Sequence, residues 1–212
     1  MLIFGAKGFA KEVLEVSLEK ESRKDIVFYD DISSDLPDRL YNEFRILRTL
    51  DQARAYLDKE DKRFVLGLGG PMLRYSSFDK FVGIGGNPYS LISSTSRIGS
   101  FGVVIEEGVN VMLNAVITND VKIGKGVLIN QIASIGHDVE IGEFVEVCPG
   151  VAIAGHCSIG KFSFLGTNST ILPNVKIGER VIVGAGSVIN RDIPDGCTVV
   201  GVPGKIIKTN NY

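Results

Sequence analysis

The chain has 212 residues, 44% hydrophobic and 23% charged, with a formal net charge of −2. It is long enough for one or two domains with a sizeable core. Its net charge is negative and does not attract nucleic acid or an anionic membrane. It begins with an apolar strand in place of a signal peptide, contains no apolar run of roughly 18 residues, and its three cysteines form no Cys-x-x-Cys pair. We therefore expect a cytoplasmic protein with free thiols and no nucleic-acid or membrane partner.

The N-terminal third predicts a small α/β unit. Apolar spacing indicates strands at 1–5, 26–29 and 63–68 and helices at 11–21 and 50–58. Asp30 and Asp31 follow the second strand directly. A strand, a glycine turn, a helix and a strand ending in an acid make half of a nucleotide-binding pattern. We expect a Rossmann-like sugar-nucleotide domain at residues 1–85.

The loop of residues 5–9 reads Gly-Ala-Lys-Gly-Phe. It lacks the third glycine of a dinucleotide fingerprint, so we expect no nicotinamide cofactor. Backbone N–H groups at the start of a helix still favour a phosphate, although the loop could equally be a packing turn. Asp30 and Asp31 could likewise be solvated loop residues. Residues 78–98 contain several glycines and a proline, and we expect an irregular hinge there.

A hexapeptide repeat occupies most of the remaining chain. Every sixth residue from Ile105 to Ile189 is Ile, Val or Leu, a small or β-branched residue commonly lies two before it, and glycine often follows it. A period of six matches neither a helix nor a lone strand. It matches a triangular prism in which residue i lies under residue i+18 and parallel strands stack roughly 4.8 Å apart. We expect the glycines to hold positive φ at the corners, and the coils to stabilise one another.

The two histidines of the chain, His137 and His156, both fall at corners of this prism. Asp138 follows His137 directly, and a neutral imidazole oriented by a carboxylate is a general base at neutral pH. The alternative is an exposed loop histidine. His156 comes nineteen residues later, one coil up and one position along. It could contact a ligand in the same groove or be another corner residue.

Metal and covalent chemistry are not expected. A zinc carbonic anhydrase built on the same kind of prism would need three histidines on one metal, and the chain supplies two. Cys148 has no ligand spacing, and it also lacks a neighbouring base that would make it a nucleophile.

Several segments resemble the hexapeptide-repeat sugar acyltransferases typified by sialic acid O-acetyltransferase and UDP-4-amino-sugar N-acetyltransferase. They are IFGAKGFAK at residues 3–11, the Asp30-Asp31 pair, INQIASIGHD at 129–138, IGEF at 141–144, LGTNSTILPN at 165–174 and GVPGK at 201–205. The resemblance implies that the α/β domain is followed by a left-handed parallel β-helix with a C-terminal tail, at residues 86–212. It also implies a homotrimer with sites at its interfaces, and acetyl-CoA-dependent acetylation of an amino or hydroxyl group on a nucleotide-activated sugar.

The resemblance further implies residue roles. His137 is the general base, Asp138 raises its basicity, and Asn130 positions the substrate near it. Sugar-nucleotide contacts are implied for Lys7, Gly8, Phe9, Asp30, Asp31 and Gly69. Contacts with acetyl-CoA are implied for Glu146, Gly155, His156, Thr167, Ala185, Gly201 and Lys205.

Three positions depart from the family pattern. Phe9 stands where the family has histidine, Glu146 also replaces a histidine, and Gly204 stands where alanine is usual. Loss of a donor at Phe9 removes a phosphate or sugar contact, although an aromatic ring can stack on a base or sugar.

Two other functions remain open. The first is acyl transfer to a non-sugar acceptor such as an amino acid, and the second is a non-catalytic solenoid scaffold. A separate nucleotide-type domain favours the sugar acceptor, while the His137-Asp138 pair argues against the scaffold.

Overall fold

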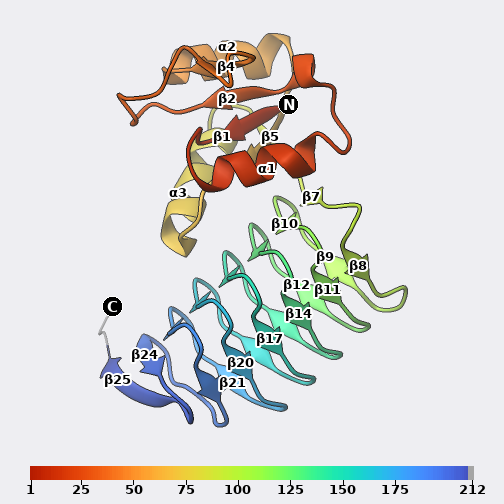
Figure 1. Ribbon diagram of the computed structural model, residues 1–212, viewed down its shortest axis with the longest axis vertical. Helices are drawn as coiled ribbons and strands as arrows, with labels where there is room; N and C mark the ends of the chain where they lie inside the picture. Colours follow the sequence, from red (N-terminus) through yellow and green to blue (C-terminus); the bar gives the residue numbers. More distant parts are fainter. Residues whose placement is uncertain (210–212) are drawn as a thin grey trace.

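An α/β unit and a three-sided parallel β-helix follow one another along the chain, and a computed structural model describes them over residues 1–209. Figure 1 shows the α/β unit above the side of the prism, whose coils advance from β7 to the C-terminal strands. The predicted fold class, an α/β domain followed by a left-handed parallel β-helix, is confirmed. No helix among the described residues is long and apolar enough to cross a membrane.

The α/β unit contains one sheet with the strand order β3-β4-β2-β1-β5-β6. The strands are β1 (Leu2–Phe4), β2 (Val27–Tyr29), β3 (Arg39–Leu40), β4 (Phe44–Leu47), β5 (Arg63–Leu66) and β6 (Asn87–Pro88). The helices are α1 (Phe9–Ser17), α2 (Leu50–Lys59) and α3 (Pro71–Val82), with a short 3₁₀ turn at Arg23–Asp25. All sheet pairings except that of β3 with β4 are parallel.

Local sequence explains these helices. The buried face of α1 includes Val13 and Leu14, which join the core beneath β1 and β2. Thr49 precedes α2 and forms a capping box, in which its hydroxyl accepts from the Gln52 N–H and the Gln52 side-chain oxygen accepts from the Thr49 N–H.

The expectation of an irregular segment from residue 78 was wrong, because helix α3 continues to Val82. Gly70, with φ of 85°, precedes the helix, and Pro71 begins it, as suits a residue without an N–H. The buried face carries Arg74, Phe78 and Phe81 at helical spacing. Its apolar stripe is interrupted by arginine, so the hydrophobic period alone did not reveal the helix.

The prism has three faces, which we number in chain order within a coil. Face 1 consists of β7 (Leu91–Ile92), β10 (Asn110–Val111), β13 (Leu128–Ile129), β16 (Glu146–Val147), β19 (Phe164–Leu165) and β22 (Ile182–Val183). Face 2 consists of β8 (Arg97–Ile98), β11 (Val116–Ile117), β14 (Ser134–Ile135), β17 (Ala152–Ile153), β20 (Thr170–Ile171) and β23 (Val188–Ile189). Face 3 consists of β9 (Val104–Ile105), β12 (Lys122–Ile123), β15 (Glu140–Ile141), β18 (Ser158–Ile159) and β21 (Lys176–Ile177). The tail adds β24 (Cys197–Val200) to face 1, followed by antiparallel β25 (Lys205–Thr209).

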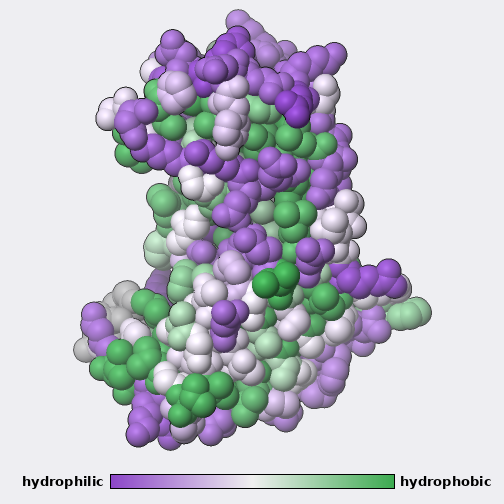
Figure 2. Space-filling model, viewed as in Figure 1, coloured by the Kyte–Doolittle hydropathy of each residue, from purple (hydrophilic) through white to green (hydrophobic). Residues whose placement is uncertain are grey.

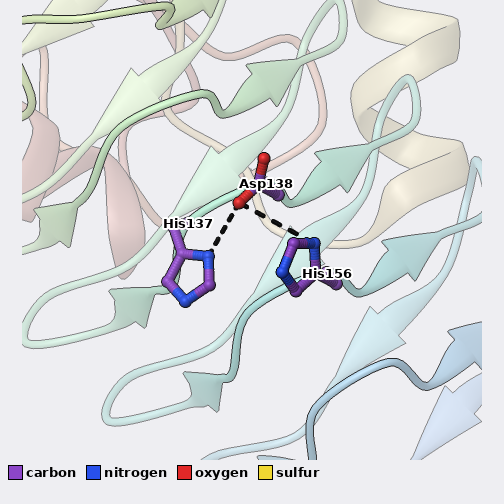
Figure 3. A group of neighbouring side chains, drawn as sticks. All are labelled: His137, Asp138 and His156. Atoms are coloured by element: carbon purple, nitrogen blue, oxygen red, sulfur yellow. Dashed lines mark hydrogen bonds and ion pairs between the residues drawn. The ribbon is translucent and has the colours of Figure 1, made fainter.

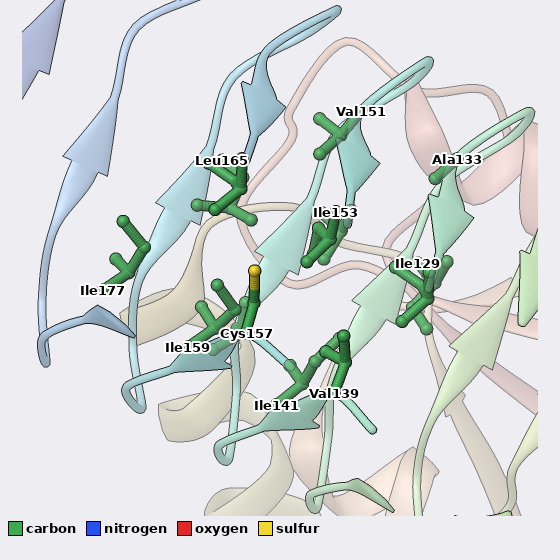
Figure 4. Close-up of a cluster of buried hydrophobic side chains, with 14 of the residues drawn as sticks. Ile129, Ala133, Val139, Ile141, Val151, Ile153, Cys157, Ile159, Leu165 and Ile177 are labelled. Carbon is green, nitrogen blue, oxygen red and sulfur yellow. The ribbon is translucent and has the colours of Figure 1, made fainter. Parts of the chain in front are cut away.

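The predicted eighteen-residue register is confirmed through the repeat. Ile117 pairs with Ile135, and Ile135 with Ile153, on adjacent coils of face 2. The aliphatic side chains and the small residues two before them point into the narrow core, as Figure 4 shows for Ala133, Cys157 and their neighbours. The three cysteines are free and buried.

The reason given for the glycines was wrong. Positive φ does not occur at the glycines that directly follow the aliphatic residues, such as Gly136 and Gly160, but two residues further on, as at Asp138. The glycines instead lie where adjacent coils come closest. A Cβ on Gly136 would lie 2.7 Å from the Gly155 nitrogen, and one on Gly160 would lie 2.4 Å from the Gly178 carbonyl carbon.

A polar and aromatic junction joins the two units. The fully buried Arg74 donates to the Leu68 carbonyl at 2.8 Å, to the Gly126 carbonyl at 3.1 Å and to the Asn110 side chain at 3.0 Å. Burial lowers the pKa of Arg74 to about 10, while nearby Glu146 acts to raise it, so the guanidinium remains charged at neutral pH. Tyr75 packs beside Arg74 against Phe144 of the prism.

The surface between the units is hollowed on one side, as the outline in Figure 2 shows. An apolar groove of about 410 Å³ lies where the start of α3 meets face 1, lined by Gly70, Pro71, Met72, Leu73, Phe162, Phe164, Arg180 and Ile182.

Candidate active site

His137 and Asp138 lie at the corner between faces 2 and 3, in the short turn that joins β14 to β15. The His137 Nδ1 and the Asp138 Oδ2 are 2.7 Å apart. An ionised carboxylate only accepts hydrogen bonds, so this contact holds the proton on Nδ1 and leaves the Nε2 lone pair free. The His137 side chain is 62% exposed, and the pair can take a proton from a molecule that reaches this corner.

Gly155 makes room for the His137 ring. It lies one coil beyond His137, and a Cβ at this position would approach the ring carbon Cε1 to 2.6 Å and Nε2 to 2.7 Å. Real Cβ atoms do not approach other atoms this closely. Gly155 is therefore needed for the position of the imidazole, whatever else it contacts.

His156 lies at the same corner. Its Nδ1 is 3.7 Å from the Asp138 Oδ2 that also faces His137, and the two imidazole rings meet edge to face with centroids 5.0 Å apart. The His156 backbone N–H donates to the His137 carbonyl at 2.9 Å. Figure 3 shows the three side chains turned toward one another around the carboxylate.

A second candidate site is a cavity of about 370 Å³ in the α/β unit. It is lined by Phe4, Gly5, Ala6, Lys7, Asp30, Asp31, Ile32, Ser33, Leu68, Leu73, Ser76, Ser77 and Lys80. Most of this lining is apolar, with two lysines and two aspartates around it. It lies outside the loops that leave the ends of β1, β2 and β5, the usual place for a ligand on a parallel sheet.

The two aspartates of this cavity differ. Asp30 is buried and accepts hydrogen bonds from the Ala6, Ile32 and Ser33 N–H groups, so it shapes the loops. Asp31 pairs with Lys80 at 2.7 Å and accepts from the Tyr29 hydroxyl at 2.7 Å. Burial would raise the pKa of Asp31, but hydrogen bonds from Lys80 and Tyr29 outweigh it and lower that pKa. Lys80 was missed because it lies on the unpredicted helix α3.

The glycine loop contributes unevenly to the cavity. Lys7 lines it and forms an ion pair with Asp35. Gly8, with φ of 36°, precedes α1, and a Cβ there would face open space. Phe9 is partly buried against the core beneath α1. Its ring is therefore used at least in part for packing.

Glu146, for which a contact with acetyl-CoA is expected, lies at the junction between the two units. Only 7% of its surface is exposed, and its carboxylate accepts a hydrogen bond from the Gly70 N–H. Gly69, expected to contact the sugar nucleotide, lies directly beside this carboxylate. Sequence alone could not show that the α/β unit covers this position.

Cys148 lies beside the same carboxylate, with its Sγ 3.9 Å from the Glu146 Oε1. Burial, together with the charge and hydrogen bond of Glu146, raises the pKa of Cys148 to about 12. The thiol is therefore protonated at neutral pH and is a poor nucleophile.

The remaining predicted residues lie apart within one chain. Asn130, Thr167 and Ala185 occupy the corner between faces 1 and 2, whereas His137 and Gly155 occupy the next corner. Asn130 is thus not beside the base of its own chain, and its side chain is buried. Gly201 and Lys205 are exposed on the tail. Residues whose numbers differ by a multiple of eighteen lie at equivalent places on successive coils, so the sequence numbers alone would have assigned these residues to different corners.

Two family models match the chain. Residues 1–87 match the PglD N-terminal domain, and residues 156–191 match the bacterial transferase hexapeptide repeat. No curated protein sequence matches the chain significantly.

Solved structures match nearly the whole chain. A mutant perosamine N-acetyltransferase from Caulobacter crescentus, in complex with CoA and GDP-perosamine, is 28% identical with a TM-score of 0.87, over 98% of this chain and 96% of that one. The acetyltransferase domain of PglB from Neisseria gonorrhoeae, in complex with acetyl coenzyme A, is 28% identical with a TM-score of 0.85, over 97% and 98%. WeeI from Acinetobacter baumannii is 27% identical with a TM-score of 0.86, over 97% and 98%.

Proposed function

Since this chain belongs to the hexapeptide-repeat sugar acyltransferases, we propose that it transfers the acetyl group of acetyl-CoA to an amino group of a nucleotide-activated sugar. The observation that carries this proposal is the His137–Asp138 hydrogen bond, which leaves the imidazole Nε2 free at an exposed corner. Similar structures that hold CoA and GDP-perosamine, or acetyl coenzyme A, support the two substrates.

Direct transfer needs no nucleophile on the enzyme. The amine nitrogen of the sugar attacks the thioester carbonyl, and His137 Nε2 takes a proton from that nitrogen. The tetrahedral intermediate then collapses, the carbon–sulfur bond breaks, and the imidazolium of His137 returns the proton to the departing CoA sulfur. The products are the N-acetyl sugar and CoA. A backbone N–H or bound water stabilises the oxyanion.

We assign the nucleotide part of the acceptor to the cavity of the α/β unit. Its apolar lining suits a base or sugar ring, and Lys7, just before the start of α1, suits a phosphate. Gly8 leaves open space in which a ligand can approach the backbone. Lys80 and Asp31 provide a charged pair beside the same cavity.

Two copies of the chain are needed for a complete site in this proposal. The acceptor cavity is lined by the α/β unit alone, and of the residues expected to bind acetyl-CoA, Gly155 and His156 lie at one corner whereas Thr167 and Ala185 lie at another. A neighbouring copy that set one corner against the other would form one groove from both, and a homotrimer provides three such grooves. The substrates are cytoplasmic metabolites, and we place the enzyme there for that reason.

The test is CoA release, measured as free thiol, with acetyl-CoA and a panel of UDP-, dTDP-, GDP- and CMP-linked sugars. Each amino sugar is paired with the sugar that carries a hydroxyl at the same carbon. We expect one amino sugar to react and its hydroxyl partner to be inert. Reaction of the hydroxyl sugar would make the enzyme an O-acetyltransferase, while a response only to free amino acids would overturn the sugar acceptor. Absence of acetyl-CoA binding would favour a scaffold.

A further inference from the structure

We propose that His137, Asp138 and His156 together bind a divalent transition-metal ion such as Zn²⁺, and that the bound ion switches the base off. The first half of this inference stands on geometry alone, and the second half rests on the proposed function. Two imidazoles and one carboxylate form a ligand set typical of zinc. The proton transfers proposed for His137 make no use of His156.

The donor atoms are close enough to share one ion. One ligand atom from each of the three residues lies within 4.8 Å of the other two. The Asp138 Oδ2 is 2.7 Å from one Nδ1 and 3.7 Å from the other. Tetrahedral zinc with bonds of about 2.0–2.1 Å requires donors roughly 3.4 Å apart. Shifts of less than about 1 Å in exposed side chains therefore complete the site.

The backbone beneath these side chains is fixed by the coil stack. Asp138 and His156 occupy equivalent positions on adjacent coils, with φ of 57° and 59°. The His156 N–H donates to the His137 carbonyl. The next coil has asparagine at the same position, Asn174, with φ of 65°. A histidine is therefore not required to make the turn, and asparagine is a suitable substitute for it.

A metal on this site prevents proton transfer by His137. Imidazole binds a metal in its neutral form through one nitrogen, and its single proton then resides on the other. When the ion replaces the proton on Nδ1, the proton moves to Nε2, and the lone pair that would accept a proton from the amine is lost. Three protein ligands leave at least one position for water on the solvent side.

The expectation of no metal site rested on the number of histidines alone. The third ligand is instead Asp138, which comes from the same turn as His137, while His156 comes from the next coil. The three ligand residues are exposed, so an ion can reach them without unfolding the chain.

Metal binding can be measured without the acetyl-transfer reaction. Titration of the purified protein with Co²⁺ should give the visible absorption of a nitrogen- and oxygen-ligated ion. His156→Asn should weaken Co²⁺ binding by at least about 10-fold, the scale of damage to metal sites. Asn174→Gly, at the same corner and outside the ligand set, should bind Co²⁺ as the unchanged protein does. A cobalt–thiolate charge-transfer band, or equal binding by the His156 variant, would overturn the site.

The regulatory half is tested by the ratio of rates with and without Zn²⁺. In the unchanged protein, the rate with Zn²⁺ should be at least about 10-fold lower than the rate without it, and EDTA should restore the rate. In His156→Asn the two rates should be nearly equal, whatever the turnover of this variant. Co²⁺ binding in a protein without transferase activity would support the metal site and contradict the proposed function. Full activity with a bound ion would remove the switch alone.

Discussion

The imidazole of His137 is positioned from two sides. Asp138 accepts from its Nδ1 on one side, and the bare α-carbon of Gly155 makes space for the ring on the other. Both neighbours come from turns of the coil stack, so the orientation of this imidazole, the proposed base, is set before a substrate arrives.

Replacement of the base should have a large kinetic effect and a small structural one. We expect His137→Ala to lower kcat by at least ~100-fold, the usual contribution of general-base catalysis. Its side chain is 62% exposed, so the melting temperature should stay close to that of the unchanged protein. Unchanged turnover would exclude His137 from the reaction.

Gly155→Ala tests the space under the ring. The added methyl group must displace the imidazole, and we expect kcat to fall by about 10-fold or more, since small misplacements of catalytic groups are costly. The double variant His137→Ala, Gly155→Ala is the control. Because no imidazole remains to be displaced, it should be no slower than His137→Ala alone.

At the scale of single residues, adjacency in sequence decided what could be predicted. His137 and Asp138 are neighbours in the chain, so their pairing was expected. The approach of Gly155 to His137 depends on two coils stacking in register. The burial of Glu146 depends on a different domain altogether, and no local pattern carries that information.

Among the elements, the corners of the prism show how one conformation constrains residue choice. The corner between faces 1 and 2 holds a left-handed residue on five successive coils, at Asn114, Ile132, Gly150, Asn168 and Gly186. Asparagine and glycine accept this conformation readily, whereas a β-branched residue does not. Ile132 is also 61% exposed, so packing offsets little of the strain.

The coil that contains Ile132 and the coil before it supply a matched pair of variants. Ile132→Asn should stabilise the protein by about 1 kcal/mol, because it relieves a left-handed β-branched residue. Asn114→Ile should destabilise it by a similar amount, since it creates the same strain one coil earlier. Urea unfolding measures both, and a loss of stability in Ile132→Asn would contradict the strain.

A network of ion pairs ties the turn after α1 to the start of β5. Arg63 bonds both Glu21 and Asp61. Burial would raise the pKa of Asp61, but hydrogen bonds from Arg63 outweigh it and lower that pKa to about 2. Since the unfolded value is about 4, the folded state binds fewer protons, and the stabilisation is lost as pH falls from about 4 to about 2.

Asp61→Asn should therefore cost about 1 kcal/mol at neutral pH, after allowance for the partial exposure of the pair. Unfolding free energies measured by urea between pH 2 and pH 7 should converge for the two proteins at the acid end. A constant difference across that range would show that the loss does not come from the charge of Asp61.

The elements that were predicted from the sequence are those in which the apolar residues recur at one uninterrupted spacing. The hexads and helices α1 and α2 met this condition, whereas α3 carries Arg74 within its buried stripe, β3 has only two residues, and β4 has the exposed Arg45 among its buried residues. A buried arginine is acceptable because both units supply its acceptors, and the acceptors from the prism, Asn110 and Gly126, are distant in sequence.

For the whole molecule, the junction around Arg74 determines how the α/β unit is held on the prism. Its guanidinium donates to carbonyl groups of both units and lies near the charge of Glu146. Arg74 therefore contributes, together with the aromatic contact of Tyr75 with Phe144, to the orientation of the α/β cavity relative to the coils.

Arg74→Met should destabilise the protein by about 3 kcal/mol, because it leaves buried carbonyls unpaired and the Glu146 carboxylate without its cation. Arg23→Met removes an exposed ion pair with Glu43 and should cost less than about 1 kcal/mol. Urea unfolding distinguishes the two. Equal losses would show that the junction contributes no more than a surface contact.

The eighteen-residue register also restricts how such a chain can change length over evolutionary time. Removal of six residues after His137 would turn every later strand onto the neighbouring face, and His156 would leave the corner it shares with His137. Removal of eighteen would preserve the faces but bring Asn174 to the place of His156. Insertions and deletions in this chain therefore behave like shifts of a reading frame, with one full coil as the codon.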